Sequence, residues 1–252
     1  MATTSLAIGI DIGGTGIKGA LVDVTTGELA SERLKVATPQ GGEPADIVAE
    51  VAAMVERFGD STGKVPVGVC FPAVVIGGRT MSAANISKRW IGLPAESLFE
   101  QTLGRDIVFV NDADAAGVAE LHFGAARNRR GLVIMTTLGT GIGSSFLYDG
   151  VLIPNTELGH LEIDGKDAER RASFAAKERG RYTWARWAKY LQRYYETVEM
   201  LFSPTLFVVG GGVSKEADQF LPLLKLRTPI VPAELRNNAG ILGAAWLAAR
   251  LL

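Results

Sequence analysis

Hydrophobic residues occur along this chain in short runs, and several of these runs end in a glycine-rich turn. The first run, residues 6–10, stops at Asp11-Ile12-Gly13-Gly14-Thr15, and alternating apolar and polar positions resume over residues 17–24. Alternation predicts strands, and a glycine turn between two strands predicts a hairpin. The same rules predict the other elements of the first half: strands over 28–36, 65–71 and 107–110, a helix over 44–58, a loop over 82–94 and a short helix after that loop.

The second half repeats this arrangement. Residues 111–123 have the spacing of a helix, and an apolar strand over 132–137 ends in Leu138-Gly139-Thr140-Gly141-Ile142-Gly143. A further strand pair turns at residues 148–150. The remaining pattern predicts helices over 168–179 and 183–202, a buried strand over 206–209, a helix from Val213 and a closing helix over 238–252.

Strands and helices alternate in both halves, which predicts an α/β fold. Each half has a strand pair with a glycine turn between its members, so we expect a duplicated fold with a central cleft. The predicted lobes are residues 1–110, onto which the helix over 238–252 packs, and residues 111–237.

Composition limits the size of the domains, the kinds of partner and the cellular compartment that we expect for this protein. The 252 residues are 47% hydrophobic, enough for one large domain or two small lobes, and the formal net charge is −1. This balance gives no global attraction to nucleic acid or to an anionic membrane, so we expect neither as a partner. Cys70 is the only cysteine, which excludes an internal disulfide and a cysteine-built metal site. With no apolar run of membrane-spanning length and no secretion signal, we expect a cytoplasmic protein.

Asp11 and the turn after it form the first candidate site. Gly13 and Gly14 carry no side chain, so backbone N–H groups there can approach a phosphate closely. Asp11 suits a magnesium ion held through water, and Thr15 and Lys18 suit phosphate oxygens. An ordinary glycine hairpin explains the same residues equally well.

The glycine turn over 138–143 is a second candidate. A dinucleotide site would need these glycines to open a helix, whereas residues 144–147 look extended, so a second phosphate-binding turn fits better. Gly210-Gly211-Gly212, before the helix predicted from Val213, suits a third contact with an anion or nucleotide.

Asn111-Asp112 follows an apolar strand and begins a helix. Both residue types are favoured helix N-caps, and that structural role accounts for the pair taken alone. In the alternative hypothesis, Asp112 is the general base that takes the proton from an attacking hydroxyl. Its position between two phosphate-type turns favours the second hypothesis.

Glu157-Leu158-Gly159-His160 brings a carboxylate and an imidazole close together, with Glu169 further along the chain. Such groups can hold adjacent sugar hydroxyls by charge-assisted hydrogen bonds. A structural histidine is the alternative, while a metal site is disfavoured because His122 is the only other histidine.

Residues 166–193 carry a local excess of positive charge, which we call the basic strip. A solvated helix face explains such a run, and Trp184, Trp187, Leu191 and Tyr194 at helical spacing suit a core. The strip could also guide a long anionic phosphate donor. Its nine members are Lys166, Arg170, Arg171, Lys177, Arg179, Arg181, Arg186, Lys189 and Arg193.

Taken together, the motifs resemble the ROK family of bacterial sugar kinases, within the actin/hexokinase/Hsp70 superfamily. The resemblance implies a two-lobed actin/hexokinase-like (ribonuclease H-like) fold and phosphoryl transfer to the 6-hydroxyl of glucose. It covers nearly the whole chain and rests on residues 11–15, 68–75 with Phe71-Pro72, Asn85, Asn111-Asp112, 138–143, 157–160 and the glycine and alanine run 240–245.

The resemblance also implies roles for individual residues. Asp112 is the catalytic base. The hexose is held by Asn85, Asn111, Asp112, Glu157, His160 and Glu169. The phosphate donor is faced by Asp11, Gly13, Gly14, Thr15, Lys18, Thr140 and Gly141. To these we add Gly211, on the pattern of the third glycine turn, and we expect Mg²⁺ as cofactor.

One departure from the family pattern changes these expectations. The family's cysteine-rich zinc motif would follow His160, but the stretch Gly165-Lys166-Asp167-Ala168-Glu169 has no thiolate, so zinc is not expected. This replacement, the short chain and the basic strip are similar to the actinobacterial polyphosphate glucokinases, including the polyphosphate/ATP-dependent glucomannokinase type. We therefore expect inorganic polyphosphate as a donor beside ATP, with glucose and mannose as candidate acceptors.

Two alternatives remain. A strictly ATP-dependent glucokinase would use the same motifs. A sugar-sensing transcriptional regulator would carry a DNA-binding domain before the kinase-like part, and we expect none because the phosphate motif begins at Asp11. The sequence leaves open whether the chain forms a homodimer.

Overall fold

The computed structural model describes residues 5–59, 64–84 and 86–251. The chain forms two compact units, residues 1–119 with 238–252 and residues 120–237, which we describe in turn. The lobe boundaries expected from the sequence, 1–110 and 111–237, stay a prediction. No helix in the described ranges is long and apolar enough to cross a membrane.

The first unit is built on a mixed sheet with the strand order β3-β2-β1-β5-β8. The β1–β2 hairpin is antiparallel, whereas β1, β5 and β8 run parallel, so their carboxyl ends meet at one edge. The strands are β1 (Leu6–Ile12), β2 (Gly16–Asp23), β3 (Glu28–Leu29), β4 (Leu34–Ala37), which pairs with β2, β5 (Val67–Phe71) and β8 (Val108–Asn111).

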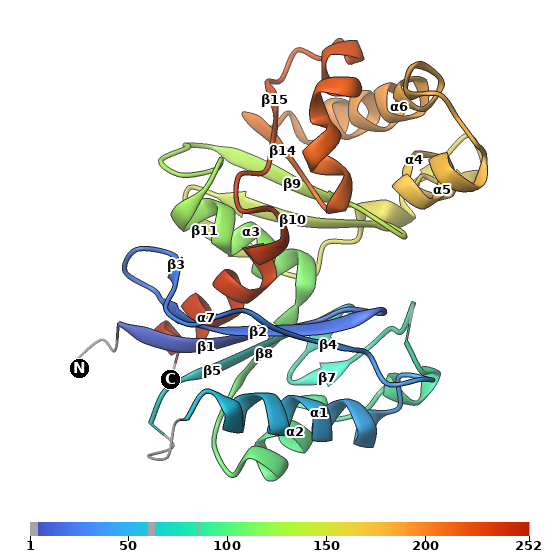
Figure 1. The fold of residues 1–252 in the computed structure, drawn as a ribbon. Coiled ribbons are helices and arrows are strands. Elements are labelled where there is room, and N and C mark those ends of the chain that lie inside the picture. The colour runs from blue at the N-terminus through green and yellow to red at the C-terminus, as the bar shows by residue number, and fades with distance from the viewer. Residues whose placement is uncertain (1–4, 60–63, 85, 252) are drawn as a thin grey trace. The chain divides into compact units, whose positions relative to one another are not determined.

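Helices cover both faces of this sheet, with α1 (Pro44–Arg57) and α2 (Ala95–Leu103) on one face and α7 (Ala239–Leu251) on the other (Figure 1). Two glycines let α7 approach closely, because a Cβ atom at Gly9 or Gly68 would overlap the backbone of Ile241 or Ala244. Smaller elements of this unit are β6 (Val75–Ile76), β7 (Arg79–Thr80) and the 3₁₀ helix η1 (Lys88–Trp90). The 3₁₀ helix η5 (Arg236–Asn238) spans the boundary between the second unit and the first.

The sheet of the second unit has the order β11-β10-β9-β14-β15. Its first three strands are antiparallel neighbours and its last two run parallel to β9, as in the first unit. The repeated strand order confirms the duplication expected from the sequence. The strands are β9 (Leu132–Leu138), β10 (Ile142–Tyr148), β11 (Val151–Ile153), β14 (Leu206–Gly210) and β15 (Ile230–Pro232).

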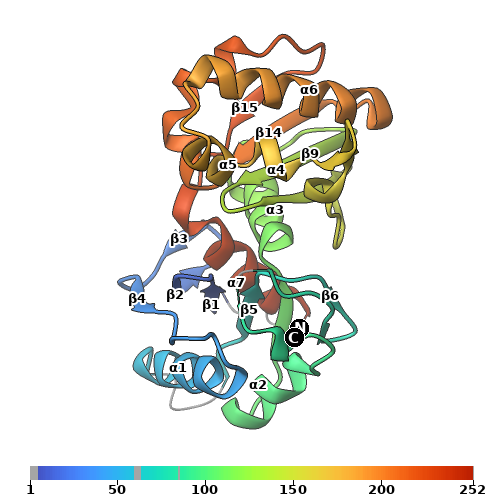
Figure 2. The same ribbon diagram turned by 90° about the vertical axis from the view of Figure 1, so that its right-hand side faces the viewer.

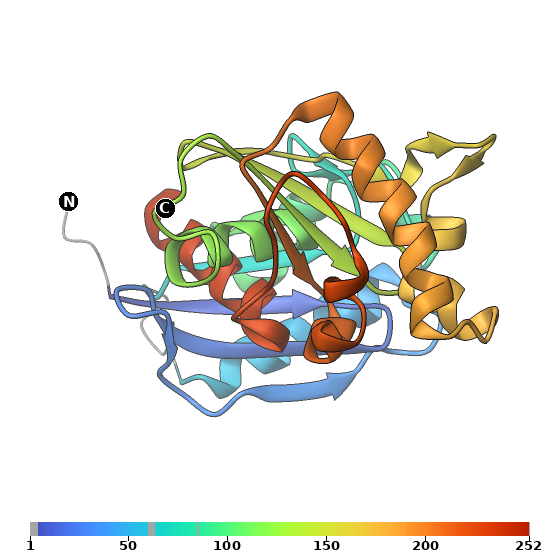
Figure 3. The ribbon, with the colours of Figure 1, turned by 90° about the horizontal axis from the view of Figure 1, so that it is seen from above.

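Helix α6 (Trp184–Phe202) lies across one face of this second sheet (Figures 2 and 3). Its apolar side buries Trp187, Leu191 and Tyr195 against residues such as Ile134 and Phe207. The aromatic spacing seen in the sequence is therefore core. The other elements are α3 (Asp112–Phe123), whose end lies in this unit, α4 (Glu169–Ala172), α5 (Phe174–Arg179), β12 (Glu162–Ile163), β13 (Lys166–Asp167), η2 (Leu158–His160), η3 (Gly212–Gln219) and η4 (Leu221–Leu223).

Three predicted elements were wrong in detail. The strand over 28–36 is two short strands, because the Ser31 hydroxyl takes the Leu21 N–H that a continuous strand would have bonded. The helix over 168–179 is broken at Ser173, which is extended and caps α5 by accepting the Ala176 N–H. The helix from Val213 is the 3₁₀ run η3, interrupted by non-helical dihedral angles at Glu216.

Candidate active site

Asp11, Lys18 and Asp112, three predicted site residues of the first unit, lie near the carboxyl ends of its parallel strands. Asp11 in β1 pairs with Lys18 in β2 on one side and with Cys70 in β5 on the other, and Cys70 pairs with Val110 in β8. Asp112 follows two residues after Val110, at the start of α3. Residues far apart in the sequence thus form one row, because parallel strands align their ends.

Asp11 is paired with positive charge. The Lys18 Nζ atom lies 3.1 Å from Asp11 Oδ2, and both side chains are mostly buried. The first turn of α7 closes over the other side, since a Cβ atom at Gly240 would lie 3.0 Å from Asp11 Cγ. The amino end of a helix carries partial positive charge, which also favours an anion there.

The turn between β1 and β2 is tied to the strand that follows it. Gly13 N donates to Gly16 O at 3.0 Å, and the Thr38 hydroxyl donates to Gly13 O at 2.5 Å. Thr38 N also donates to Thr15 O at 3.4 Å. Gly14 and Thr15 at the tip are exposed, so the turn is fixed at its base and open at its tip.

The contacts of Asn111 and Asp112 show which of the two caps the helix, while the role of Asp112 as general base stays a prediction. Asn111 Oδ1 accepts the N–H groups of Ala113 and Asp114, at 2.8 and 3.0 Å, and its amide donates to Ala73 O at 3.0 Å. Asn111 is therefore the N-cap of α3. Asp112 is half-buried in the first turn, where Oδ1 accepts the Ala113 N–H at 2.8 Å.

Sequence reasoning missed Cys70 as part of this arrangement. Its buried thiol lies 3.7 Å from Asp11 Oδ1. Burial raises the pKa of the Cys70 thiol well above its usual value, and the negative charges of Asp11 and Asp112 raise it further. What places Cys70 beside Asp11 is the parallel pairing of β1 with β5, and no local sequence pattern indicates which strands pair.

In the second unit, Glu169 joins two of the predicted motifs. Its Oε2 atom accepts the Ile142 N–H at 3.1 Å, directly after the turn that holds Thr140 and Gly141. A Cβ atom at Gly141 would overlap this carboxylate, and one at Gly159 would lie 3.0 Å from it. Glu169 thus packs against the second glycine turn and against η2. At Gly159 the tightest contact is with the backbone, since a Cβ atom there would lie 2.4 Å from Ile142 O.

Glu157 and His160 lie at the two ends of η2. The pKa of the Glu157 carboxyl is raised by partial burial and by Glu169, while the nearby His160 lowers it. Glu157 keeps exposed surface, so solvent screens these effects. His160 Nδ1 lies 3.3 Å from Asp167 Oδ2, which orients an otherwise exposed ring. The structure therefore brings Glu157, His160 and Glu169 together.

Gly211 lies beside the second glycine turn. Its φ of +84° is one that side chains rarely adopt, and a Cβ atom there would lie 2.5 Å from Leu138 O. The predicted second and third phosphate turns are thus neighbours in the second unit.

The basic strip is only partly available to a ligand. Lys177 Nζ lies 4.2 Å from the centre of the Trp184 ring, and Arg171 and Arg193 both lie near Asp164. Arg186 stacks over Tyr182, and Arg179 donates to a backbone carbonyl. The exposed remainder is Lys166, Arg170, Arg181 and Lys189.

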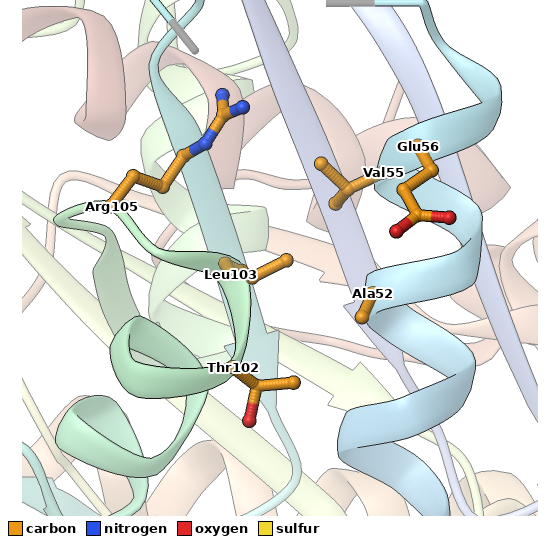
Figure 4. A pocket seen from close by; sticks show the side chains of 6 residues that line it. All are labelled: Ala52, Val55, Glu56, Thr102, Leu103 and Arg105. Carbon is orange, nitrogen blue, oxygen red and sulfur yellow. The ribbon is translucent and has the colours of Figure 1, made fainter.

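Other features of the described ranges add no second site. Asn85 lies outside the described residues, so its predicted role is untested. Within these ranges, no group of three or more His, Cys, Asp or Glu side chains could hold a metal ion. A pocket between α1 and the end of α2 is lined by Ala52, Val55, Glu56, Thr102, Leu103 and Arg105 (Figure 4), none of which was predicted as a site residue.

Comparison with known sequences gives a consistent result. The sequence profile of the ROK family matches residues 7–172. The chain is 48% identical over 238 residues to the polyphosphate glucokinase of Mycobacterium tuberculosis, covering 94% of this chain and 89% of that protein.

Solved structures agree with the sequence comparison. The inorganic polyphosphate/ATP-glucomannokinase from Arthrobacter sp. strain KM is 51% identical, with a TM-score of 0.94 over 99% of this chain and 100% of that chain. A ROK family glucokinase from Streptomyces griseus, in complex with glucose and AMPPNP, is 27% identical, with a TM-score of 0.84 over 97% and 99% of the two chains. These likenesses confirm the predicted actin/hexokinase-like α/β fold.

Proposed function

The chain belongs to the ROK family, and from that premise we propose that it phosphorylates the 6-hydroxyl of glucose with inorganic polyphosphate or ATP as donor. The observation that carries the proposal is the 48% identity to a polyphosphate glucokinase over nearly the whole chain. The proposal is also supported by the row of Lys18, Asp11 and Cys70, which has Asp112 beside it. This arrangement brings a phosphate-type turn close to a candidate base. Mannose is a second acceptor, favoured by the likeness to a glucomannokinase.

In the proposed reaction, Asp112 accepts the proton of the glucose 6-hydroxyl as its oxygen attacks the terminal phosphorus of the donor. The new O–P bond forms while the bond to the rest of the donor breaks, and the donor leaves one phosphate shorter. Asn111, Glu157, His160 and Glu169 hold the hexose in this proposal, together with Asn85. The donor is held by Asp11, Gly13, Gly14, Thr15, Lys18, Thr140, Gly141 and Gly211.

Magnesium is the cation that we propose beside the donor. Asp11 is a single carboxylate next to an open glycine turn, and one of its oxygens already faces Lys18. This donor set fits Mg²⁺, which keeps several waters and binds one or two carboxylates plus substrate phosphates. Bound there, the ion would neutralise charge on the transferred phosphoryl group.

The test is glucose 6-phosphate formation by the purified protein with magnesium, glucose and either nucleotide-free polyphosphate or ATP. We expect turnover with both donors, and competition between them shows whether one site serves both. Turnover with ATP alone would leave a strictly ATP-dependent glucokinase. No turnover with either donor would contradict the kinase assignment and favour a sugar-sensing regulator, which a gel-shift assay for specific DNA binding would then test.

The exposed part of the basic strip gives a prediction specific to the long donor. Changing Arg170, Arg181 and Lys189 to Gln together should raise the KM for polyphosphate by about two- to tenfold and reduce its dependence on salt, because exposed charges attract a polyanion over long range. The KM for ATP should change less, because a short donor reaches fewer of these charges. Initial rates at low and high ionic strength measure both.

A matched control removes the same charge elsewhere in the second unit. Arg127, Arg129 and Arg130 are exposed and lie before β9, at the opposite end of that strand from the glycine turn. Their triple change to Gln should leave the KM for polyphosphate within about twofold of wild type. Equal effects of the two triple variants would mean that only total charge matters.

A further inference from the structure

Cys70 stands in the row formed by Lys18, Asp11 and Val110, although nothing in its sequence context indicates a role there. It pairs laterally with Asp11 in β1 and with Val110 in β8. Neighbouring residues at the same level of a sheet point to the same face, so the thiol and the Asp11 carboxylate lie side by side. Asp112 is close enough for its charge to act on the thiol.

The two oxygens of Asp11 have different partners. Lys18 Nζ lies 3.1 Å from Oδ2, and Cys70 Sγ lies 3.7 Å from Oδ1, within the reach of a sulfur hydrogen bond. A thiol is a weak donor, whereas a carboxylate is only an acceptor. The S–H group therefore donates to Asp11, and together Lys18 and Cys70 fix the plane of the carboxylate.

The backbone of α7 packs against this contact. A Cβ atom at Gly240 would lie 3.0 Å from Asp11 Cγ and 3.1 Å from Cys70 Sγ, so only glycine fits without displacing one of them. Cys70 is fully buried.

From these contacts we propose that Cys70 is a positioning residue, which holds Asp11 in the orientation that the phosphate donor and its cation require. This inference rests on the donor-binding role proposed for Asp11. The competing explanation is packing alone, because a buried cysteine also behaves as a small apolar side chain and Cys70 contacts Ala115 and Ala244.

Two variants separate the hydrogen bond from packing. Cys70→Val fills the space without a donor, and we expect it to raise the KM for both ATP and polyphosphate by about two- to tenfold, the range for one lost hydrogen bond. The KM for glucose should stay within about twofold, since Asp11 does not contact the sugar in the proposed reaction. Cys70→Ser keeps a hydroxyl donor and should restore the donor KM to within about twofold of wild type.

The control is Val69→Ala in the same strand. Val69 is fully buried in the core on the other face of the sheet, so its truncation should lower the Tm without raising the donor KM. Steady-state kinetics and thermal unfolding of the four proteins provide the comparison. An unchanged donor KM in Cys70→Val, or a donor KM that rises in Val69→Ala in step with the loss of Tm, would overturn the proposal.

Calorimetric binding of polyphosphate with Mg²⁺ separates this proposal from the proposed function. If the wild type forms no glucose 6-phosphate, the kinase assignment fails on that result. The Cys70 proposal is then decided by binding alone: weaker donor binding in Cys70→Val than in Cys70→Ser supports it, and equal binding refutes it.

Discussion

Asp112→Asn is expected to lower kcat for glucose phosphorylation by about 10²–10⁴-fold, the usual contribution of a general base. The substitution replaces a carboxylate that can accept the hydroxyl proton by an amide that cannot. The fold should survive, because Asn111 caps α3 through its own contacts and the amide oxygen that the substitution introduces can still accept the Ala113 N–H. Glucose 6-phosphate formation measures kcat, and calorimetry should show glucose binding within a few-fold of wild type.

Asp106→Asn is the matched control for this variant. Asp106 is exposed just before β8, the strand that ends at Asn111, so the same change of charge falls at the opposite end of the same element. Its kcat should equal that of the wild type. A kcat of Asp112→Asn close to that of this control would remove Asp112 from the role of base.

Glu120→Ala is expected to lower the free energy of unfolding by at least about 3 kcal/mol. Glu120 is fully buried in α3, and its carboxylate accepts three backbone N–H groups: Ala125 at 2.7 Å, Leu235 at 2.8 Å and Glu234 at 3.2 Å. Truncation removes the acceptor of three partly buried N–H groups, and each such loss costs about 1–3 kcal/mol. Denaturant unfolding measures the loss, and thermal unfolding should show a Tm lower by roughly 6 °C or more.

Two further variants bracket this result. Glu120→Gln keeps the volume and one carbonyl oxygen, so its loss of stability should lie between those of wild type and Glu120→Ala. Glu196→Ala removes an exposed glutamate from α6 and should change stability by less than about 0.5 kcal/mol. A loss for Glu120→Ala no larger than that of Glu196→Ala would show that water replaces the carboxylate at these N–H groups.

In the candidate site, the sequence predicted several of the residues but not the contacts that they make. The motif Asn111-Asp112 predicted a helix start, but only the side-chain contacts assign the cap to Asn111, since both residue types cap helices equally well. Cys70 was read only as a lone thiol, because its importance depends on a neighbouring strand some 60 positions away. Glu169 was assigned to the sugar by resemblance, whereas its contact with Ile142 comes from the tertiary fold.

The sequence by itself determined the α/β class, the strand pairs with their glycine turns, the long helices and membership of the ROK family, since local periodicity and short motifs encode these. Tertiary structure alone decided that β1, β5 and β8 align their carboxyl ends, which places Lys18, Asp11 and Cys70 in one row beside Asp112. It also decided which cations of the basic strip are occupied by Asp164, Trp184 and Tyr182. Strand register and long-range side-chain contacts depend on packing between distant segments, and local sequence patterns do not carry that information.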